Sequence, residues 1–194
     1  VGRHQSDGYY ENVFLDSKRN NAQDELSIRS KLRAEMSDTW TLDFSLSHVD
    51  IDNGYDAFTL DNSRTTLSDE PGRDKQSSVA FAVDSKWELE RFDLELILGL
   101  ADSDMEYSYD EDWTFAGIHP DGYSSTDSYN RNRETQSLEL RVISNDSSRL
   151  FNDSTQWLFG LYTLSSDEAL KREYTFASSD FFSDFAFDTT AFFI

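Results

Sequence analysis

The stretch that decides the fold runs from Leu26 to Ser47 and reads LSIRSKLRAEMSDTWTLDFSLS. In each half of this stretch, apolar side chains stand at every second position, apart from Ser30 on the apolar side, and polar side chains stand between them. An amphipathic helix would need apolar residues three and four positions apart, where Arg29 and Arg33 stand instead. Two such runs joined by a few turn residues predict an antiparallel hairpin.

The same alternation recurs along the chain. It predicts strands around 79–89, 94–100, 137–142 and 157–164, a weaker strand at 1–12, and a further, incomplete one at 189–194. Together with the first hairpin these segments make about seven strands. We therefore predict an all-β fold in which the strands follow one another as an antiparallel meander.

The predicted connections differ in length between the two ends of the strands. Residues 37–39 and 90–92 form short turns, and 144–155 form an intermediate one. The long connections are acidic and polar, and lie at 13–23, 51–76, 102–134 and 165–188. Short turns at one end and long loops at the other are typical of a transmembrane β-barrel, whereas long structureless loops count against an ordinary compact domain.

Tryptophan placement supports the same interpretation. Trp40, Trp87 and Trp157 all stand next to the short or intermediate connections, and so at one end of the strands. Indole rings collect at the boundary between lipid and water, so this placement predicts an aromatic girdle at the short-turn end. The alternative is that large aromatic residues simply favour strands and pack at the ends of a sandwich.

Composition limits the classes of function. The chain has 194 residues, 38 Asp and Glu against 17 Lys and Arg, a formal charge of −21, and no cysteine. The charge argues against nucleic acid as a partner, and the lack of cysteine excludes disulfides and thiolate metal sites. Aromatic residues make up 14% of the chain, which argues against disorder. Low mean hydropathy does not exclude a barrel, because a membrane-spanning strand is apolar only at alternate positions.

The polar face of the predicted strands distinguishes a barrel from a soluble sandwich. Charges on that face would line a wet interior, where they cost little, whereas Lys or Arg at the lipid midplane would cost roughly 2–4 kcal/mol. The sequence places no such charge in the middle of its apolar faces. We therefore expect the following residues to face the lumen: Arg29, Lys31, Arg33, Asp43, Asp84, Lys86, Glu95, Glu139 and Arg141.

Four stretches of the chain resemble the barrel of TonB-dependent outer-membrane receptors. The first is DELSIRSKLR at 24–33. The second, which is the most distinctive, is DNGYDAFTLDN at 52–62 followed by RTTLSDEPG at 64–72. The third is YDEDW at 109–113, and the fourth is LELRV at 138–142 before WLFGLY at 157–162. The resemblance extends over nearly the whole chain.

The resemblance implies outer-membrane uptake of a bulky nutrient, such as a ferric siderophore, in a Gram-negative bacterium. It implies a barrel of about 22 strands closed by an N-terminal plug and energised through the TonB complex. Residues 1–194 are then an internal barrel fragment without plug or closing C-terminal strand. Outer-membrane lipid and lipopolysaccharide are the expected surroundings.

The long loops are the predicted ligand surface. Aromatic side chains supply large contact area at small entropy cost. The candidate ligand-binding residues are Tyr55, Phe58, Tyr107, Tyr109, Trp113 and Tyr123. The acidic segment 50–56 has Ile51 where an EF-hand loop needs an acid or Asn, and the Glu of the twelfth loop position is absent. No motif of a metalloprotease, α/β-hydrolase or nucleotide-binding loop occurs, so we expect no catalysis, metal or cofactor.

Two alternatives remain open at this point. A secreted soluble β-sandwich that acts as a binding module would show the same alternation. An outer-membrane hydrolase would need a Ser-His-Asp arrangement that forms only in space.

Overall fold

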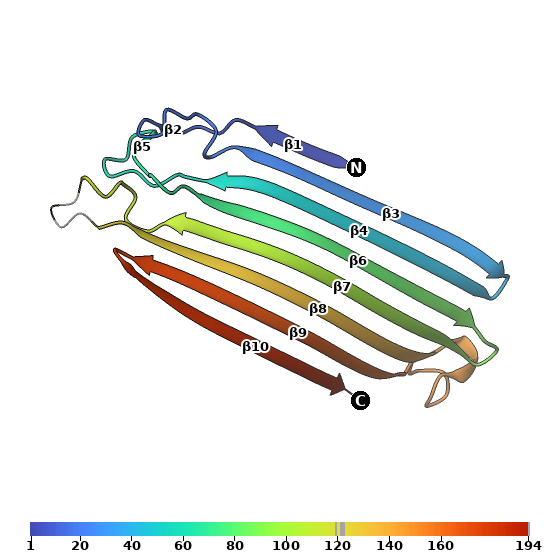
Figure 1. Ribbon diagram of the computed structural model, residues 1–194. Helices are drawn as coiled ribbons and strands as arrows, with labels where there is room; N and C mark the ends of the chain where they lie inside the picture. The colour runs from blue at the N-terminus through green and yellow to red at the C-terminus, as the bar shows by residue number, and fades with distance from the viewer. Residues whose placement is uncertain (119, 121–122, 194) are drawn as a thin grey trace.

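The computed structural model describes residues 1–118, 120 and 123–193, and shows one layer of long antiparallel strands (Figure 1). The eight-stranded sheet has the order β1-β3-β4-β6-β7-β8-β9-β10 and is not closed. Its strands are β1 (Gly2–Ser6), β3 (Gln23–Ser37), β4 (Trp40–Tyr55), β6 (Gly72–Glu88), β7 (Phe92–Asp110), β8 (Ser125–Ser144), β9 (Leu158–Phe176) and β10 (Ser179–Phe193).

Two short elements complete the described fold. The strands β2 (Glu11–Asn12) and β5 (Thr65–Thr66) form a small parallel sheet within the long loops. A single 3₁₀ turn, η1 (Asp146–Ser148), lies between β8 and β9. Among the described residues no helix has the length and apolar character needed to cross a bilayer.

The alternating stretch forms the predicted hairpin. β3 and β4 pair antiparallel with Leu32 opposite Phe44 and Ala34 opposite Leu42, and the register shifts only between Glu35 and Ser37, beside the turn. Successive side chains of a strand point to opposite faces of the sheet. The two apolar runs therefore share one face, and the pairing of the remaining strands continues this face from β4 to β9.

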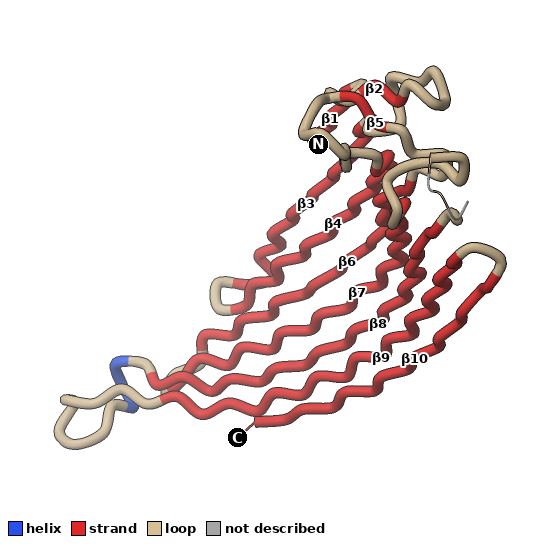
Figure 2. Tube along the Cα trace, turned by 90° about the vertical axis from the view of Figure 1, so that its left-hand side faces the viewer, coloured by secondary structure: helices blue, strands red, loops and turns tan. Residues whose placement is uncertain are grey.

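Exposure distinguishes the two faces, which we name outer and inner. Along β9 the outer-face residues from Phe159 to Glu173 are exposed, whereas the inner-face residues from Gly160 to Tyr174 are partly covered. Side chains on the concave side of a curved sheet shield one another. The sheet therefore curves around its polar face. Figure 2 shows the strands of this sheet side by side along the Cα trace.

The outer face carries a band of uncovered apolar side chains. Among the described residues no hydrophobic side chain is buried, so the sheet has no hydrophobic core of its own. Exposed members of the band are Leu32 (63%), Leu46 (46%), Val79 (47%), Leu100 (41%), Leu138 (43%) and Phe159 (50%). Such an extended patch marks a surface that contacts lipid or another apolar partner. A sandwich would bury it.

The apolar band occupies only the part of each strand near the short turns. On β6 it runs from Val79 to Trp87, which corresponds to about 20 Å along a barrel axis for a rise of ~3.3 Å per residue and a tilt of ~40°. This is close to the ~25 Å apolar band of outer-membrane barrels. Beyond it, outer-face positions such as Asp102 and Asp104 on β7 are acidic. The strands therefore continue past the band.

Three tryptophans lie at the short-turn end, as the sequence predicts. Trp40 and Trp87 are partners in the β4–β6 register, and their rings stack with centroids 5.8 Å apart. The Trp40 indole N–H donates to Ser85 Oγ at 3.0 Å. The Trp157 indole N–H donates to the carbonyl of Ser148 at 2.8 Å, in the connection between β8 and β9.

The predicted loop boundaries need correction. The segment 165–188 is not a loop, because β9 and β10 run through it and are joined at 177–178. The connections predicted at 51–76 and 102–134 shrink to 56–71 and 111–124, and the 1–12 strand divides into β1 and β2. Three long connections (7–22, 56–71 and 111–124) remain at one end of the sheet. The final strand begins at Ser179 instead of 189, and residue 194 lies outside the described residues.

β10 departs from the polar inner face of the other strands. Phe181, Phe185 and Phe187 pair with inner-face residues of β9, and their exposures are 56%, 47% and 53%. The polar character of the inner face therefore ends at this strand.

Candidate functional site

Aromatic side chains form a connected cluster at the long-loop end of the inner face. Tyr107 on β7 lies at the centre, with ring centroids 5.2 Å from Tyr55 on β4 and 6.3 Å from Tyr129 on β8. Tyr109 follows two positions later on β7, 5.7 Å from Tyr107. Since residues two apart share a face, the register places these tyrosines side by side.

Two loop residues extend the cluster. The ring of Phe58, after β4, lies 5.8 Å from Tyr55 and stacks on Trp113 at 5.0 Å with an interplanar angle of 10°. Trp113 belongs to the loop between β7 and β8. The two long loops thus meet above the strand tyrosines.

Asp127 on β8 is the polar centre beside the aromatic cluster. Its carboxylate is 2% exposed and accepts two hydrogen bonds from Arg172 on β9, from Nε at 2.9 Å and from Nη2 at 2.6 Å. The hydroxyls of Tyr129 and Tyr109 donate to Asp127 Oδ2 at 2.9 and 3.3 Å. The Arg172 guanidinium also lies over the Tyr129 ring, 5.3 Å from its centroid. This network fixes the tyrosine hydroxyls in place.

This network lies beyond the apolar band, and it sets the protonation states of Asp127 and Tyr109. Burial alone raises the pKa of the Asp127 carboxyl, but hydrogen bonds from Arg172 and Tyr129 outweigh it and hold the pKa below its usual range. Burial and the nearby Asp127 charge raise the pKa of Tyr109 to about 12. At pH 7 the site therefore presents protonated phenols beside an ionised carboxylate whose charge Arg172 balances.

Trp113 is held in an unusual backbone conformation by the loop around it. Its φ is 63°, in the left-handed region that non-glycine residues rarely adopt. The backbone N–H groups of Asp112 and Trp113 donate to Asp110 Oδ1 at 3.2 and 3.1 Å. Thr114, which is fully buried, connects to the other loop because its carbonyl accepts from the Asp69 N–H at 3.0 Å.

Polar contacts between loops replace a hydrophobic core at this end. Asn12 Nδ2 donates to Asp56 at 2.8 Å and to the Ser68 carbonyl at 2.7 Å, and Thr66 Oγ1 donates to Asp56 at 2.8 Å. All four residues are at least nine-tenths buried. These hydrogen bonds bind the connections 7–22 and 56–71 to each other, and the Asp69–Thr114 hydrogen bond adds the connection 111–124.

A cavity of about 860 Å³ opens against the aromatic cluster. Its walls combine the rings of Phe58, Tyr107, Tyr109, Trp113 and Tyr129 with the charged residues Asp74, Glu111 and Arg131, among others. The volume falls in the range of pockets for drug-sized ligands, which are lined mostly by apolar and aromatic groups with a few polar ones.

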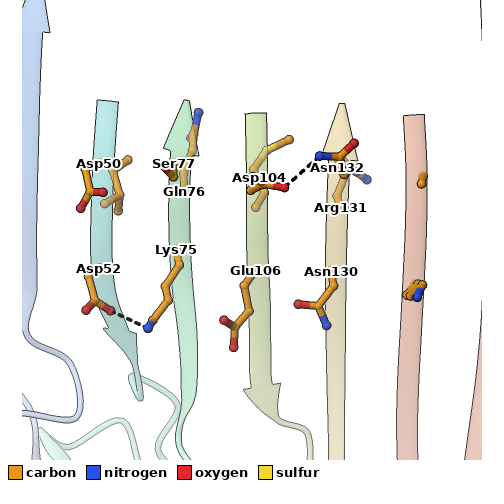
Figure 3. A pocket seen from close by; sticks show the side chains of 14 residues that line it. Asp50, Asp52, Lys75, Gln76, Ser77, Asp104, Glu106, Asn130, Arg131 and Asn132 are labelled. Atoms are coloured by element: carbon orange, nitrogen blue, oxygen red, sulfur yellow. Dashed lines mark hydrogen bonds and ion pairs between the residues drawn. The ribbon is translucent and has the colours of Figure 1, made fainter. Parts of the chain in front are cut away.

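A second cavity, of about 510 Å³, lies against the part of the strands beyond the apolar band (Figure 3). It is lined mainly by outer-face residues, and within it Lys75 pairs with Asp52 at 3.1 Å while Asn132 Nδ2 donates to Asp104 at 2.9 Å. Its lining is polar and mixed in charge. It contains none of the predicted ligand residues.

The structure brings together five of the six predicted ligand residues. Tyr55, Phe58, Tyr107, Tyr109 and Trp113 are linked by ring contacts, whereas the described ring contact of Tyr123 is with Phe176 on β9, at 5.0 Å. Tyr107 and Tyr109 lie on β7 and Tyr55 ends β4, so the prediction that these three are loop residues is wrong.

Sequence reasoning missed several inner-face residues of β8 and β9 around the predicted ones, of which Asp127 and Tyr129 stand directly opposite Tyr109 and Tyr107. These are Asp127, Tyr129, Arg131, Arg172 and Tyr174. The alternation Asp127-Tyr129-Arg131-Arg133 was the available signal, but it lay within the segment assigned to a loop. The nine predicted lumen residues do lie on the inner face, where Arg33 pairs with Asp43 at 2.7 Å and Arg141 with Glu95 at 3.1 Å.

The aromatic cluster is not accompanied by a metal-binding group in the described part of the chain. In residues 1–118, 120 and 123–193 no group of three or more His, Asp or Glu side chains is arranged to hold a metal ion. The arrangement offers ring faces, phenol hydroxyls and guanidinium groups, which are suited to binding.

Comparisons with known proteins identify the fold. No protein-family model and no curated protein matches the sequence. Among solved structures, the chain is similar to the ferric yersiniabactin uptake receptor FyuA from Yersinia pestis, with a TM-score of 0.72 and 16% identity. The match covers 98% of this chain and 29% of that receptor. The chain thus has the fold of part of that receptor, and its open antiparallel sheet agrees with the partial barrel that the sequence predicts.

Proposed function

We propose that the chain forms part of the wall of an outer-membrane receptor that takes up a bulky nutrient such as a ferric siderophore. The observation that carries the proposal is the two-faced wall: an apolar outer band continues over several strands, and a cavity with aromatic walls opens at one end. The likeness to a ferric uptake receptor supports it. The role is transport without catalysis.

The proposal assigns each part of the wall a task. The apolar outer band contacts lipid, with the Trp40–Trp87 pair at one boundary. The long-loop end faces the exterior with lipopolysaccharide around it. The aromatic cluster, which includes five of the six predicted residues, meets the solute, and so does Tyr123 beside Phe176. Passage along the polar inner face would depend on a plug and on the TonB complex, which lie beyond residues 1–194. The soluble sandwich is not favoured, because none of the residues that the structure describes forms an apolar layer over the outer band.

The test uses the complete receptor in its own bacterium. Deleting the gene should abolish uptake of at least one iron complex under iron limitation, and restoring the gene should recover it. Uptake should also stop in a strain without TonB. The double variant F58A/W113A should lower uptake because it removes the stacked pair above the cavity, whereas Phe182→Ala, on the outer face of β10, should not. Unchanged iron uptake in the deletion strain would overturn the proposal.

A further inference from the structure

Two arginines on the inner face share one carboxylate. Glu168 on β9, with a side chain 16% exposed, contacts Arg131 Nε at 3.1 Å through Oε1, and its Oε2 accepts from Arg133 Nε at 2.6 Å. The two guanidinium groups are 39% and 45% exposed. The trio carries a net charge of +1 in a chain of −21.

The Arg131 guanidinium is only loosely engaged by Glu168. Its Nε is buried and within ion-pair distance of Oε1, yet it makes no hydrogen bond. Arg133, in contrast, donates a well-formed bond to the other carboxylate oxygen. Because this Nε is buried, the capacity to bind another acceptor belongs to the terminal Nη groups of the partly exposed side chain, since a guanidinium offers five N–H groups in a planar fork.

Arg131 lines the cavity whose walls are the aromatic rings. In the β7–β8 register Arg131 pairs with Met105. The next inner-face pair toward the long loops is Tyr129 with Tyr107. A molecule lying on the Tyr107 and Tyr129 rings thus meets the Arg131 guanidinium at its lower edge.

The acids near the cavity are mostly engaged elsewhere. Glu111 accepts from the hydroxyls of Tyr174, at 3.0 Å, and Ser125. Glu106 occupies an outer-face position of β7, and the charge of Asp127 is balanced by the ion pair with Arg172. Asp74, on the inner face beside Tyr107, and Glu111, whose hydrogen-bond donors are neutral hydroxyls, are acids of the cavity wall that favour a cationic ligand, whereas Arg131 favours an anionic group.

We propose that the cavity binds an iron complex whose organic part presents an aromatic ring to Tyr107 and Tyr129 and an anionic oxygen, phenolate or carboxylate, to Arg131. The inference rests on the proposed function and narrows its substrate class. Ring stacking and a charge-assisted hydrogen bond then act together. An anionic complex without aromatic rings would satisfy only the Arg131 part of the site, and a cationic complex without aromatic rings would satisfy neither part.

Three ferric complexes test this on the purified complete receptor: a tris-catecholate, which is aromatic and anionic; ferric citrate, which is anionic without rings; and a cationic trihydroxamate. Binding is measured with radioactive iron. We expect the tris-catecholate to bind tightest. Arg131→Gln should weaken it about tenfold, or about 1.4 kcal/mol, and leave the trihydroxamate unchanged. Glu168 keeps Arg133 in this variant, so the fold should persist.

Arg141→Gln is the matched control, because Arg141 lies on the same strand and face but beside the short turns, and should bind all three complexes as the wild type does. Tightest binding of the trihydroxamate, or an equal effect of Arg131→Gln and Arg141→Gln on the tris-catecholate, would overturn the inference and leave the uptake function standing. Binding of none of the three by the wild type, together with unchanged iron uptake on gene deletion, would overturn both.

Discussion

Arg172 holds the carboxylate of Asp127 through two hydrogen bonds, of 2.9 and 2.6 Å, across the inner face of β8 and β9. The acid is 2% exposed, whereas the arginine side chain is 41% exposed. The pair lies 45 residues apart in sequence. It joins the last two strands of the aromatic site to each other and, through Tyr109, to β7.

Arg172→Gln should destabilise the complete receptor, because it leaves a buried carboxylate with only phenol donors. Loss of a charge-assisted hydrogen bond costs about 1.5–3 kcal/mol, and the partial exposure of Arg172 favours the lower end. Urea unfolding in lipid vesicles measures the change. Arg3→Gln removes an exposed 3.4 Å pair with Asp24, which solvent screens, and should cost clearly less stability than Arg172→Gln. Equal losses in the free energy of unfolding would show that the Asp127 network contributes no more stability than an exposed ion pair.

Leu96→Lys should impair insertion of the complete receptor into membranes, since Leu96 is an outer-face residue within the apolar band. A lysine there costs roughly 2–4 kcal/mol if it lies near the lipid midplane. Ser45→Lys, on the inner face of β4, should insert normally. The folded fraction after dilution into vesicles measures both. Equal tolerance at the two positions would contradict the assignment of faces.

The Trp40–Trp87 pair should lie at a lipid–water boundary. In the complete receptor, with its other tryptophans replaced by phenylalanine, the fluorescence of this pair should be quenched more by a lipid carrying its quencher near the headgroup than by one carrying it at the chain end. The physical reason is that indole rings settle at the interface. The reverse order of quenching would place the pair in the hydrocarbon centre, and no quenching would place it outside the membrane.

The loop that carries Trp113 should respond to pH through Asp110. Burial raises the pKa of this carboxyl, which lies at the loop end of β7, to about 7 from 3.8. A raised acid pKa stabilises the folded loop fully below about pH 4, and this contribution is lost as the pH rises through about 7. The slope is at most about 1.4 kcal/mol per pH unit. Hydrogen exchange at the Trp113 amide should therefore accelerate, beyond its intrinsic base catalysis, between pH 5 and 8.

Asp110→Asn provides the comparison for this pH effect. The amide oxygen can still accept from the Trp113 N–H, which is 3.1 Å from Oδ1 in the wild type, but the side chain no longer titrates. The extra acceleration should disappear. Asp61→Asn, in an exposed loop, should retain it. An Asp110→Asn protein that behaves as the wild type would exclude Asp110 as the responsible group.

The sequence by itself determined the strands of the apolar band and their two faces. Alternation is a local property, and a buried or lipid-facing side contrasts strongly with a wet one, so Leu94 to Leu100 could be assigned without any partner strand. The end tryptophans and the lumen charges followed from the same contrast. Beyond the band, residues such as Asp104 and Ser103 are polar on both faces, which removes the contrast. The strands predicted from the sequence therefore end too early.

Only the tertiary structure decided which residues form the site. Tyr55, Tyr107 and Tyr129 lie on three strands, and their meeting depends on a register that continues without a shift from β4 to β8. Arg172 reaches Asp127 because β9 pairs with β8 along its whole length. The alternation within a single strand shows which face a residue occupies, but it does not show which residue lies next to it on the adjacent strand. That neighbour is determined by the register between strands that are far apart in sequence.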